Sequence, residues 1–372
     1  MSVLVEGRSA AEVLAWSRTM VDPALRAAVD SLPESMRHIA GYHFGWWDER
    51  GRPALGSPAL GSPALGSPAL GSPALGSPAV GFSGPVGGKA IRPALVLLAA
   101  EAVGAASADA VPAAAAVELV HNFSLLHDDV MDGDLTRRHR KTAWSVFGVN
   151  AAILAGDALL ALALDILAGS GQPAAVEGVR MVAAAVLDLI EGQSADLAFE
   201  TRTAVALPDC VRMAEGKTGA LLGCACAIGV AFGGGRPRQA TQLRAFGAQL
   251  GLAFQHVDDL LGIWGDPAIT GKPVHSDLQR RKKSLPVVAA LTSGTPAGAE
   301  LAAFYRREQA LSGADLARAA ELVELAGGRA WSRAQADDLL AAALDHLRSA
   351  GPVPRTATEL ATLALFATRR DC

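Results

Sequence analysis

Aromatic and charged residues are both scarce in this 372-residue chain, at 5% and 19% of the composition, whereas hydrophobic residues make up 51%. Alanine and leucine dominate the hydrophobic set, and segments that alternate polar with apolar residues are nearly absent. Such a composition argues against a sheet-based fold and is typical of a large helical bundle with a sizeable core. We therefore predict an all-α protein.

Positive charge and cysteine are also limited. The formal net charge is −4 and the isoelectric point is near 6.1, which argues against general nucleic-acid binding. Four cysteines, Cys210, Cys224, Cys226 and Cys372, are too few to staple a chain of this length. Cys224 and Cys226 stand among small apolar residues with no second Cys/His pair to complete a zinc set, so we expect core packing.

Targeting signals are not evident. The first residues lack a basic segment followed by an apolar core, so no secretory signal is predicted. No stretch of roughly 20 residues is free of both charge and helix breakers, so no transmembrane segment is predicted either. These features favour a cytoplasmic location.

A pentapeptide repeat interrupts the N-terminal part of the chain. Pro-Ala-Leu-Gly-Ser occurs five times from Pro53 to Ser77 and then decays to Pro-Ala-Val-Gly-Phe. Proline and glycine at this density prevent both helix and sheet, so a flexible loop is expected, with a partner-binding tether as the alternative. The predicted organisation is an N-terminal helical region (1–52), the repeat loop (53–84) and a helical bundle (85–372) that forms one domain with residues 1–52.

Apolar residues recur at helical spacing over most of the remaining chain. The N-terminal helical region covers about residues 9–45 and ends in an aromatic cluster, Tyr42, Phe44, Trp46 and Trp47. Further helices are predicted over 92–106, 110–132, 151–168, 174–199, 208–232, 237–262 and 284–292, with helical patches across 299–366. Short loops between these segments favour antiparallel neighbours in a single bundle.

Two aspartate clusters lie inside apolar helical segments. Asp128, Asp129 and Asp132 form the first, and Asp128 and Asp132 stand one turn apart on one helix face. Asp258 and Asp259 form the second. Carboxylates in apolar helices are costly unless a cation neutralises them, and hard oxygen ligands suit Mg²⁺. A solvated helix end would explain one Asp pair, but two such clusters, each followed by basic residues, favour a metal site.

Basic and polar residues near the clusters suit metal-bridged diphosphates, since Arg gives forked contacts and Lys a point charge. They are Lys89, Arg92, Arg137, Arg138, Lys217, Thr218, Lys272, Lys282 and Lys283.

These motifs together resemble the trans-polyprenyl diphosphate synthases, the polyprenyl synthetase family. The resemblance runs from about residue 85 to at least residue 290. In order, its motifs are G-G-K-x-x-R-P (from 87), L-x-H-D-D-x-x-D with R-R behind it (125–138), G-D-x-L-L (156–160), G-Q-x-x-D-L (192–197), K-T-G (217–219), F-Q-x-x-D-D (254–259) and G-K-P with a later K-x-S-x-P (271–286). Each motif alone is weak, but the ordered set is specific.

The resemblance implies an isoprenoid-synthase-type helical bundle with a central cavity and two facing Asp-rich helices. It implies a Mg²⁺-dependent prenyltransferase that condenses isopentenyl diphosphate with an allylic diphosphate, and a homodimer. Three Mg²⁺ ions would be bound, two by Asp128 and Asp132 and a third by Asp258, with Asp129 and Asp259 in support. The allylic diphosphate would be held by Arg137, Lys217, Thr218, Gln255, Lys272 and Lys282, and isopentenyl diphosphate by Lys89, Arg92, His121 and Arg138. Asp128, Asp132, Asp258, Lys217 and Lys272 would carry the catalysis.

His121 lies two turns before Asp128, which suits a functional place, although a buried core histidine is the alternative. In the resembling family, the residues four and five positions before the first Asp help to form the floor of the chain pocket. Here these are Ser124 and Phe123. A small residue at one position and an aromatic residue at the other favour a C20 product, geranylgeranyl diphosphate.

Two positions depart from the family pattern. Gly262 stands where the fullest second motif has a third Asp, with Asp266 as the nearest replacement, and His275 stands where Gly is usual. Two other functions remain open at this point. A terpene cyclase of the same fold would have no use for Lys89, Arg92 and Arg138, and a non-catalytic partner subunit would be expected to have a damaged first cluster.

Overall fold

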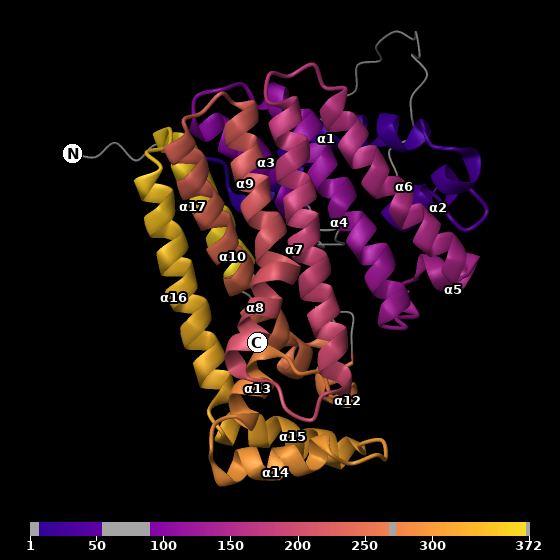
Figure 1. The fold of residues 1–372 in the computed structure, drawn as a ribbon, viewed down its shortest axis with the longest axis vertical. Coiled ribbons are helices and arrows are strands. Elements are labelled where there is room, and N and C mark those ends of the chain that lie inside the picture. The colour runs from indigo at the N-terminus through magenta and orange to yellow at the C-terminus, as the bar shows by residue number, and fades with distance from the viewer. Residues whose placement is uncertain (1–6, 54–89, 268–272, 370–372) are drawn as a thin grey trace, which may run out of the picture.

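The computed structural model describes residues 7–53, 90–267 and 273–369, which form a bundle of long helices (Figure 1). Its helices are α1 (Ala10–Asp30), α2 (Glu34–Phe44), α3 (Ile91–Ala102), α4 (Val111–Met131), α5 (Ala143–Phe147), α6 (Val149–Ala168), α7 (Ala175–Thr201), α8 (Leu207–Ala214), α9 (Ala220–Phe232), α10 (Pro237–Trp264), α12 (Ser276–Gln279), α13 (Leu285–Leu291), α14 (Pro296–Tyr305), α15 (Gly313–Leu325), α16 (Gly328–Ser349) and α17 (Pro354–Thr368). The all-α prediction is confirmed. The repeat from residue 54 onward, Lys89, Lys272 and Cys372 lie outside the described residues.

Three short elements complete the fold. A 3₁₀ turn, η1 (Ser107–Ala110), follows α3, which ends at Ala102 rather than at residue 106. A π-helical turn, η2 (Glu215–Gly219), separates α8 from α9, where the periodicity predicted one continuous helix over 208–232. An antiparallel hairpin of β1 (Thr136–Arg137) and β2 (Arg140–Lys141) follows α4 and was not predicted.

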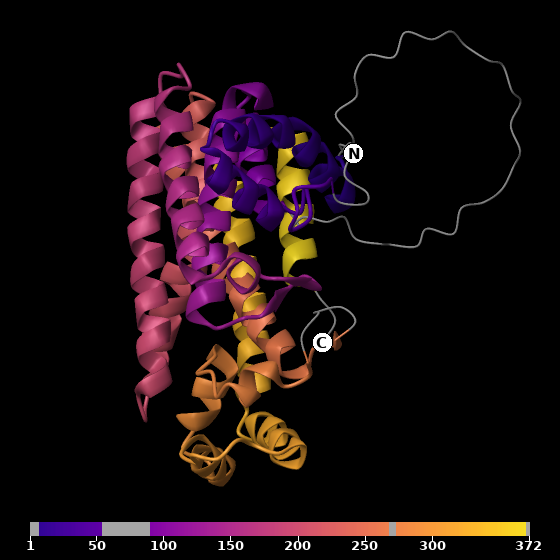
Figure 2. The ribbon, with the colours of Figure 1, turned by 90° about the vertical axis from the view of Figure 1, so that its right-hand side faces the viewer.

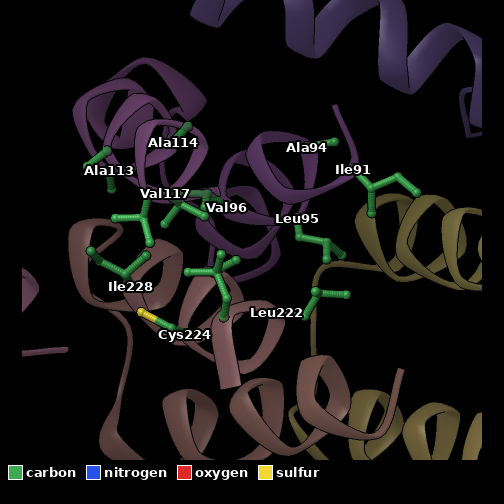
Figure 3. Packing of buried hydrophobic residues seen from close by; sticks show 14 of the residues in the cluster. Ile91, Ala94, Leu95, Val96, Ala113, Ala114, Val117, Leu222, Cys224 and Ile228 are labelled. Atoms are coloured by element: carbon green, nitrogen blue, oxygen red, sulfur yellow. The ribbon is translucent and has the colours of Figure 1, made fainter. Parts of the chain in front are cut away.

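Helix α9 forms the centre of the bundle and contacts α3, α4, α7 and α10. Small residues allow this close packing: a Cβ atom on Gly229 would lie 2.2 Å from the backbone oxygen of Val96 on α3. Figure 3 shows Leu222, Cys224 and Ile228 among the apolar side chains of α3 and α4. Cys224 and Cys226 are buried in this core, as expected from their surroundings.

Two apolar segments meet the length and composition of a membrane-spanning helix, Val149–Ala168 and Leu207–Phe232. The second is 72% buried inside the fold, as a core helix would be, whereas the first is only 39% buried. The core helices of proteins that do not span a membrane pass the same test, so this result is weak evidence for a span.

The segment before α1 is fastened to helix α17. Arg8, just before the capping box of α1, donates its Nε to Glu359 on α17 at 2.9 Å, and its guanidinium also contacts Glu101 on α3. Helix α17 packs on α1 and α3, whereas α14 and α15 lie across the opposite end of the bundle (Figures 1 and 2). Helix α16 runs between these two ends.

Candidate active site

The aspartate clusters lie near the C-terminal ends of α4 and α10. Asp128 and Asp129 occupy the last turn of α4, and Asp132 is its C-cap. Asp258 and Asp259 lie within the last two turns of α10. Helix dipoles place partial negative charge at these ends, so the carboxylates add negative charge where it is already unfavourable. Both clusters therefore need nearby positive charge to offset this repulsion.

The first cluster contains one buried and two more accessible carboxylates. Asp129 is buried and accepts a hydrogen bond from Nε of Arg137 at 2.7 Å, while its Oδ2 is buried without a partner. Burial raises the pKa of Asp129 to about 6, against the opposing effect of Arg137. Burial also raises the pKa of Asp128, and Lys217 opposes it. Asp132 is exposed.

The second cluster divides its carboxylates in the same way. Asp259 is buried and accepts from Nε2 of Gln255 at 2.8 Å and from the backbone amide of Leu285 at 2.9 Å. Burial raises its pKa to about 7, although Lys282 counteracts this effect. Asp258 is exposed. The arrangement therefore leaves Asp258 accessible and uses Asp259 to tie α10 to α13.

Lys217 and Thr218 enter the site from the π-helical turn η2. Nζ of Lys217 is 2.7 Å from Oδ2 of Asp196, and Oγ1 of Thr218 donates to Oε1 of Gln255 at 2.6 Å. Asp196 belongs to the G-Q-x-x-D-L motif, so the sequence contained the signal, but it was not selected as a site residue. Gln255 in turn donates to Asp259, so one hydrogen-bond chain links η2, α10 and α13.

Glycines of the neighbouring helices α7 and α10 allow their backbones to pack closely against the π-helical turn. A Cβ atom on Gly192 of α7 would lie 2.3 Å from the backbone nitrogen of Lys217. A Cβ atom on Gly251 of α10 would lie 2.8 Å from Cα of Gly219. The turn is thus enclosed by backbone on two sides, and π-helical turns of this kind are frequent at functional sites.

Arg92 and His121 lie side by side on α3 and α4. NH1 of Arg92 donates to Nε2 of His121 at 3.2 Å, since a guanidinium has no acceptor. Burial lowers the pKa of Arg92 to about 10, and Glu118 opposes this shift. Burial, and then Arg92, hold the pKa of His121 well below its ordinary value. His121 is therefore a neutral ring. Glu118 is a nearby carboxyl group that sequence reasoning missed; burial raises its pKa, and Arg92 opposes this effect.

Lys282 lies among carboxylates of three elements. Burial disfavours its ammonium group, but Asp277, Asp259 and Asp196 outweigh that effect and raise its pKa. Lys283, by contrast, donates to the backbone oxygen of Glu200 at 3.2 Å. The second lysine of the pair therefore faces away from this cluster of carboxylates.

The Asp277 carboxyl group occupies the space beside Gly262, where the fullest family motif has a third Asp. A Cβ atom on Gly262 would lie 2.4 Å from Oδ2 of Asp277, so the Asp277 carboxyl group fills the volume that a side chain at 262 would need. The backbone amide of His275 bonds to the oxygen of Ile263 at 3.2 Å and docks this segment on α10. Asp277 therefore adds a carboxylate beside the second cluster, and a supporting role for Asp266 stays a prediction.

Backbone strain is concentrated in the segments that supply the cations. Among the described non-glycine residues, positive φ angles occur at Ala90 (48°), Arg138 (52°), His139 (62°), His275 (63°) and Arg281 (51°). Ala90 precedes Arg92, Arg138 and His139 follow the first aspartate cluster, and the other two lie in the segment before Lys282. Such strain persists where the surroundings hold it, and it clusters at functional sites.

The two halves of the site face each other. The guanidinium of Arg280 donates to the carboxylate of Asp134, which follows the first cluster. Asp128 is influenced by Lys217, and Arg92 by Asp258, across the bundle. The structure therefore gathers both aspartate clusters and their described basic partners, apart from Lys283, into one region.

The residues present suit Mg²⁺. Over 7–53, 90–267 and 273–369, no group of three or more His, Cys, Asp or Glu side chains could hold a metal ion by itself. Mg²⁺ ordinarily keeps several waters and binds through one or two carboxylates together with substrate phosphates. The accessible oxygens of Asp132 and Asp258, and the buried unpartnered Oδ2 of Asp129, form the hard donor set that it prefers.

The two candidates for product length lie on α4. Ser124 is buried, and its Oγ donates to the backbone oxygen of His121 at 2.8 Å. The ring of Phe123 is also buried and lies edge-on to the ring of His127, with 4.8 Å between centroids. His127 in turn approaches α6, where its Nε2 is 3.0 Å from the backbone oxygen of Ile153.

A helical bundle that brings two carboxylate clusters and several basic side chains to one site fits the class of enzymes that act on diphosphates with a divalent metal. The chain belongs to the polyprenyl synthetase family, because the family model "Polyprenyl synthetase" matches residues 82–323. It is 44% identical to a (2E,6E)-farnesyl diphosphate synthase of Mycobacterium tuberculosis over 96% of this chain and 93% of that protein. It is also 44% identical to a geranylgeranyl diphosphate synthase of the same species, over 97% and 94%.

A solved structure agrees with these matches. The polyprenyl synthetase from Streptomyces coelicolor A3(2) superposes with a TM-score of 0.84 at 44% identity, covering 95% of this chain and 98% of that one. The chain is therefore a trans-prenyltransferase that uses isopentenyl and allylic diphosphates, and Mg²⁺ is the ion typical of its family. The prediction of the family and of its reaction is confirmed.

Proposed function

We propose that the enzyme extends an allylic diphosphate with isopentenyl diphosphate to a linear C20 product, geranylgeranyl diphosphate. Support comes from the pairing of buried Ser124, one turn below Asp128, with buried Phe123 beside it. Identity does not decide the length, since the farnesyl and geranylgeranyl relatives are equally similar at 44%. The proposed product length therefore rests on Ser124 and Phe123.

The proposed site has two diphosphate positions. The allylic diphosphate is held by Arg137, Lys217, Thr218, Gln255, Lys272 and Lys282, and isopentenyl diphosphate by Lys89, Arg92, His121 and Arg138. Three Mg²⁺ ions, held by Asp128, Asp132 and Asp258 with Asp129 and Asp259 in support, would supply Lewis-acid stabilisation of the departing diphosphate. Lys217 and Lys282 add positive charge where that anion develops. Residues 1–52 and 85–372 form one catalytic domain.

Bonds within the site support this division of roles. Asp196 and Gln255 orient Lys217 and Thr218 on the allylic side. His121 accepts a hydrogen bond from Arg92 on the other side and remains neutral beside it. A neutral ring can keep one nitrogen as an acceptor for Arg92 and offer the other as a donor to a diphosphate oxygen.

Chromatography of the products tests the proposed length. With labelled isopentenyl diphosphate, geranyl diphosphate and Mg²⁺, the wild type should stop at C20. Phe123→Ala should give longer products because it removes a bulky group, and Ser124→Phe should give C15 because it fills the space below Asp128. Unchanged lengths in both variants would place the floor elsewhere, for example on α6.

A homodimer is also part of the proposal. Large apolar side chains are exposed on the adjacent helices α6 and α7: Ile153, Leu154, Leu187 and Ile190. Exposed apolar surface of this kind commonly marks a protein interface. Light scattering should therefore show a dimer for the wild type and a monomer for the Leu154→Asp/Leu187→Asp variant. The proposed enzyme is cytoplasmic. The pentapeptide repeat would serve as a tether for a partner.

A further inference from the structure

The turn that presents Arg138 has an unfavourable backbone conformation. Arg137 pairs with Arg140 across the hairpin, which leaves Arg138 and His139 as a two-residue turn with φ angles of 52° and 62°. Turns with two positive φ angles ordinarily use Asn and Gly, because these residues tolerate the left-handed region. Arg and His are strained there, so contacts outside the turn must hold it closed.

Arg140 supplies such contacts. Its NH1 donates to the backbone oxygen of Tyr42 at 3.0 Å, and its NH2 donates to the backbone oxygen of Trp47 at 3.2 Å. The guanidinium also lies over the Tyr42 ring, 4.6 Å from its centroid. The hydroxyl of Tyr42 returns a hydrogen bond to the backbone oxygen of Lys141 at 2.8 Å. Both residues of β2 are thus fastened to the C-terminal end of α2.

The acceptors are themselves held in place. Gly45 ends α2 with φ at 80°, and the amide of Trp46 bonds to the oxygen of Gly41 at 2.9 Å. The Trp47 ring fills the space beside Gly41, since a Cβ atom there would lie 1.9 Å from the ring. Its Nε1 donates to the oxygen of His38 at 2.8 Å. The aromatic cluster recognised in the sequence is therefore a rigid anchor for the hairpin.

Arg137 is held by a side-chain hydrogen bond outside the hairpin, and no such bond is described for Arg138. Nε of Arg137 is bonded to buried Asp129, so its position does not depend on the hairpin alone. Arg138 lies at the tip of the turn with a largely exposed side chain; burial of its guanidinium lowers its pKa and Glu118 opposes that shift, so its position depends on the turn and on this electrostatic attraction. Loosening β2 should consequently displace Arg138 more than Arg137.

We propose that Arg140 is a positioning residue: by fastening β2 to the backbone of Tyr42 and Trp47, it holds the strained turn that aims Arg138 at the diphosphate of isopentenyl diphosphate. The inference rests on the proposed assignment of Arg138 to that substrate. In this proposal Arg140 acts without contacting either substrate. The aromatic cluster influences the site through its bonds to Arg140 and through the bond of Tyr42 to Lys141.

Steady-state kinetics of the full chain test the inference. Arg140→Met should raise the KM for isopentenyl diphosphate about 10-fold, and the KM for the allylic diphosphate less than about 3-fold, since a small displacement of a binding group has large effects. Adding His139→Gly should recover most of the loss, because glycine adopts the turn without the clamp. Arg348→Met, which removes an exposed arginine from α16, serves as the matched control.

Several results would overturn the inference. If the double variant binds isopentenyl diphosphate as poorly as Arg140→Met, Arg140 does not act through the turn. If both KM values rise equally, the effect is general. Tyr42→Phe, which removes only the bond to Lys141, should raise the KM about 2-fold and replaces Arg140→Met if that variant does not fold. If Arg138→Ala leaves the KM unchanged, the assignment of Arg138 under the proposed function fails first, and the inference fails with it.

Discussion

Gly192→Ala is the substitution that best tests whether the enclosed π-helical turn matters. The added Cβ atom would lie 2.3 Å from the nitrogen of Lys217, 2.8 Å from the oxygen of Met213 and 2.9 Å from the carbonyl carbon of Gly216. All three are backbone atoms, so no side chain can rotate away. Either α7 or the turn that carries Lys217 has to move.

The size of the movement follows from these distances. Ordinary contact begins at 3.4 Å, so the closest approach must grow by 3.4 − 2.3 = 1.1 Å. A displacement of this order at a substrate-positioning group lowers turnover about 10²-fold. Overpacking of this kind also lowers the free energy of unfolding by about 1–3 kcal/mol, which leaves a large helical protein folded.

The assay is kcat with saturating geranyl diphosphate, isopentenyl diphosphate and Mg²⁺, together with thermal unfolding followed by circular dichroism. Gly313→Ala is the matched control, because nothing lies within 4 Å of a Cβ atom at the start of α15. The control should keep both kcat and Tm. A Gly192→Ala enzyme with wild-type kcat would refute the argument that the position of the turn is needed for turnover.

Three further predictions follow. Asp128→Ala should lower turnover at least about 10²-fold while the helical circular dichroism spectrum is kept, and near wild-type rates would contradict its proposed role. Burial, and then Arg137 and Arg138, lower the pKa of His43 to about 3. The unfolded chain therefore binds a proton below about pH 6.5 that the fold does not, and stability falls as the pH falls toward 3. Urea unfolding at pH 7 and pH 5 should show that His43→Gln loses less stability than the wild type, by about 1–2 kcal/mol, and equal losses would contradict this. Deleting residues 54–77, which keeps the bridge between Trp47 and Pro53, should leave Tm and turnover almost unchanged, because loop length changes closure entropy only slowly; loss of activity would make the repeat structural.

The main helices and the location of the aspartate clusters could be predicted from the sequence. Apolar residues at helical spacing determine which segments become helices, and α4 ends at Met131, one residue from the predicted end. The substrates, by contrast, were predicted only from the resemblance to the family. The roles of individual site residues stay predictions.

Other features depend on residues far apart in the chain. Periodicity over 208–232 contains no sign of the π-helical turn, since the glycines that enclose it belong to α7 and α10. Asp277 reaches Gly262 only because the segment after α10 folds back on that helix. The Arg138–His139 turn runs against local propensity and is held by the segment after α2. Sequence reasoning fails at these points because tertiary contacts override local preference.

The contact between Arg8 and Glu359 also bears on how the chain is made. These residues are 351 positions apart, and α1 packs on α17. At a synthesis rate of about 5–20 residues per second, Arg8 emerges from the ribosome roughly 20–70 s before its partner. During that time α1 has to remain unassembled or pack provisionally on α3 and α4. Formation of the contact between Arg8 and Glu359 is therefore a late event in biosynthesis relative to the synthesis of α1.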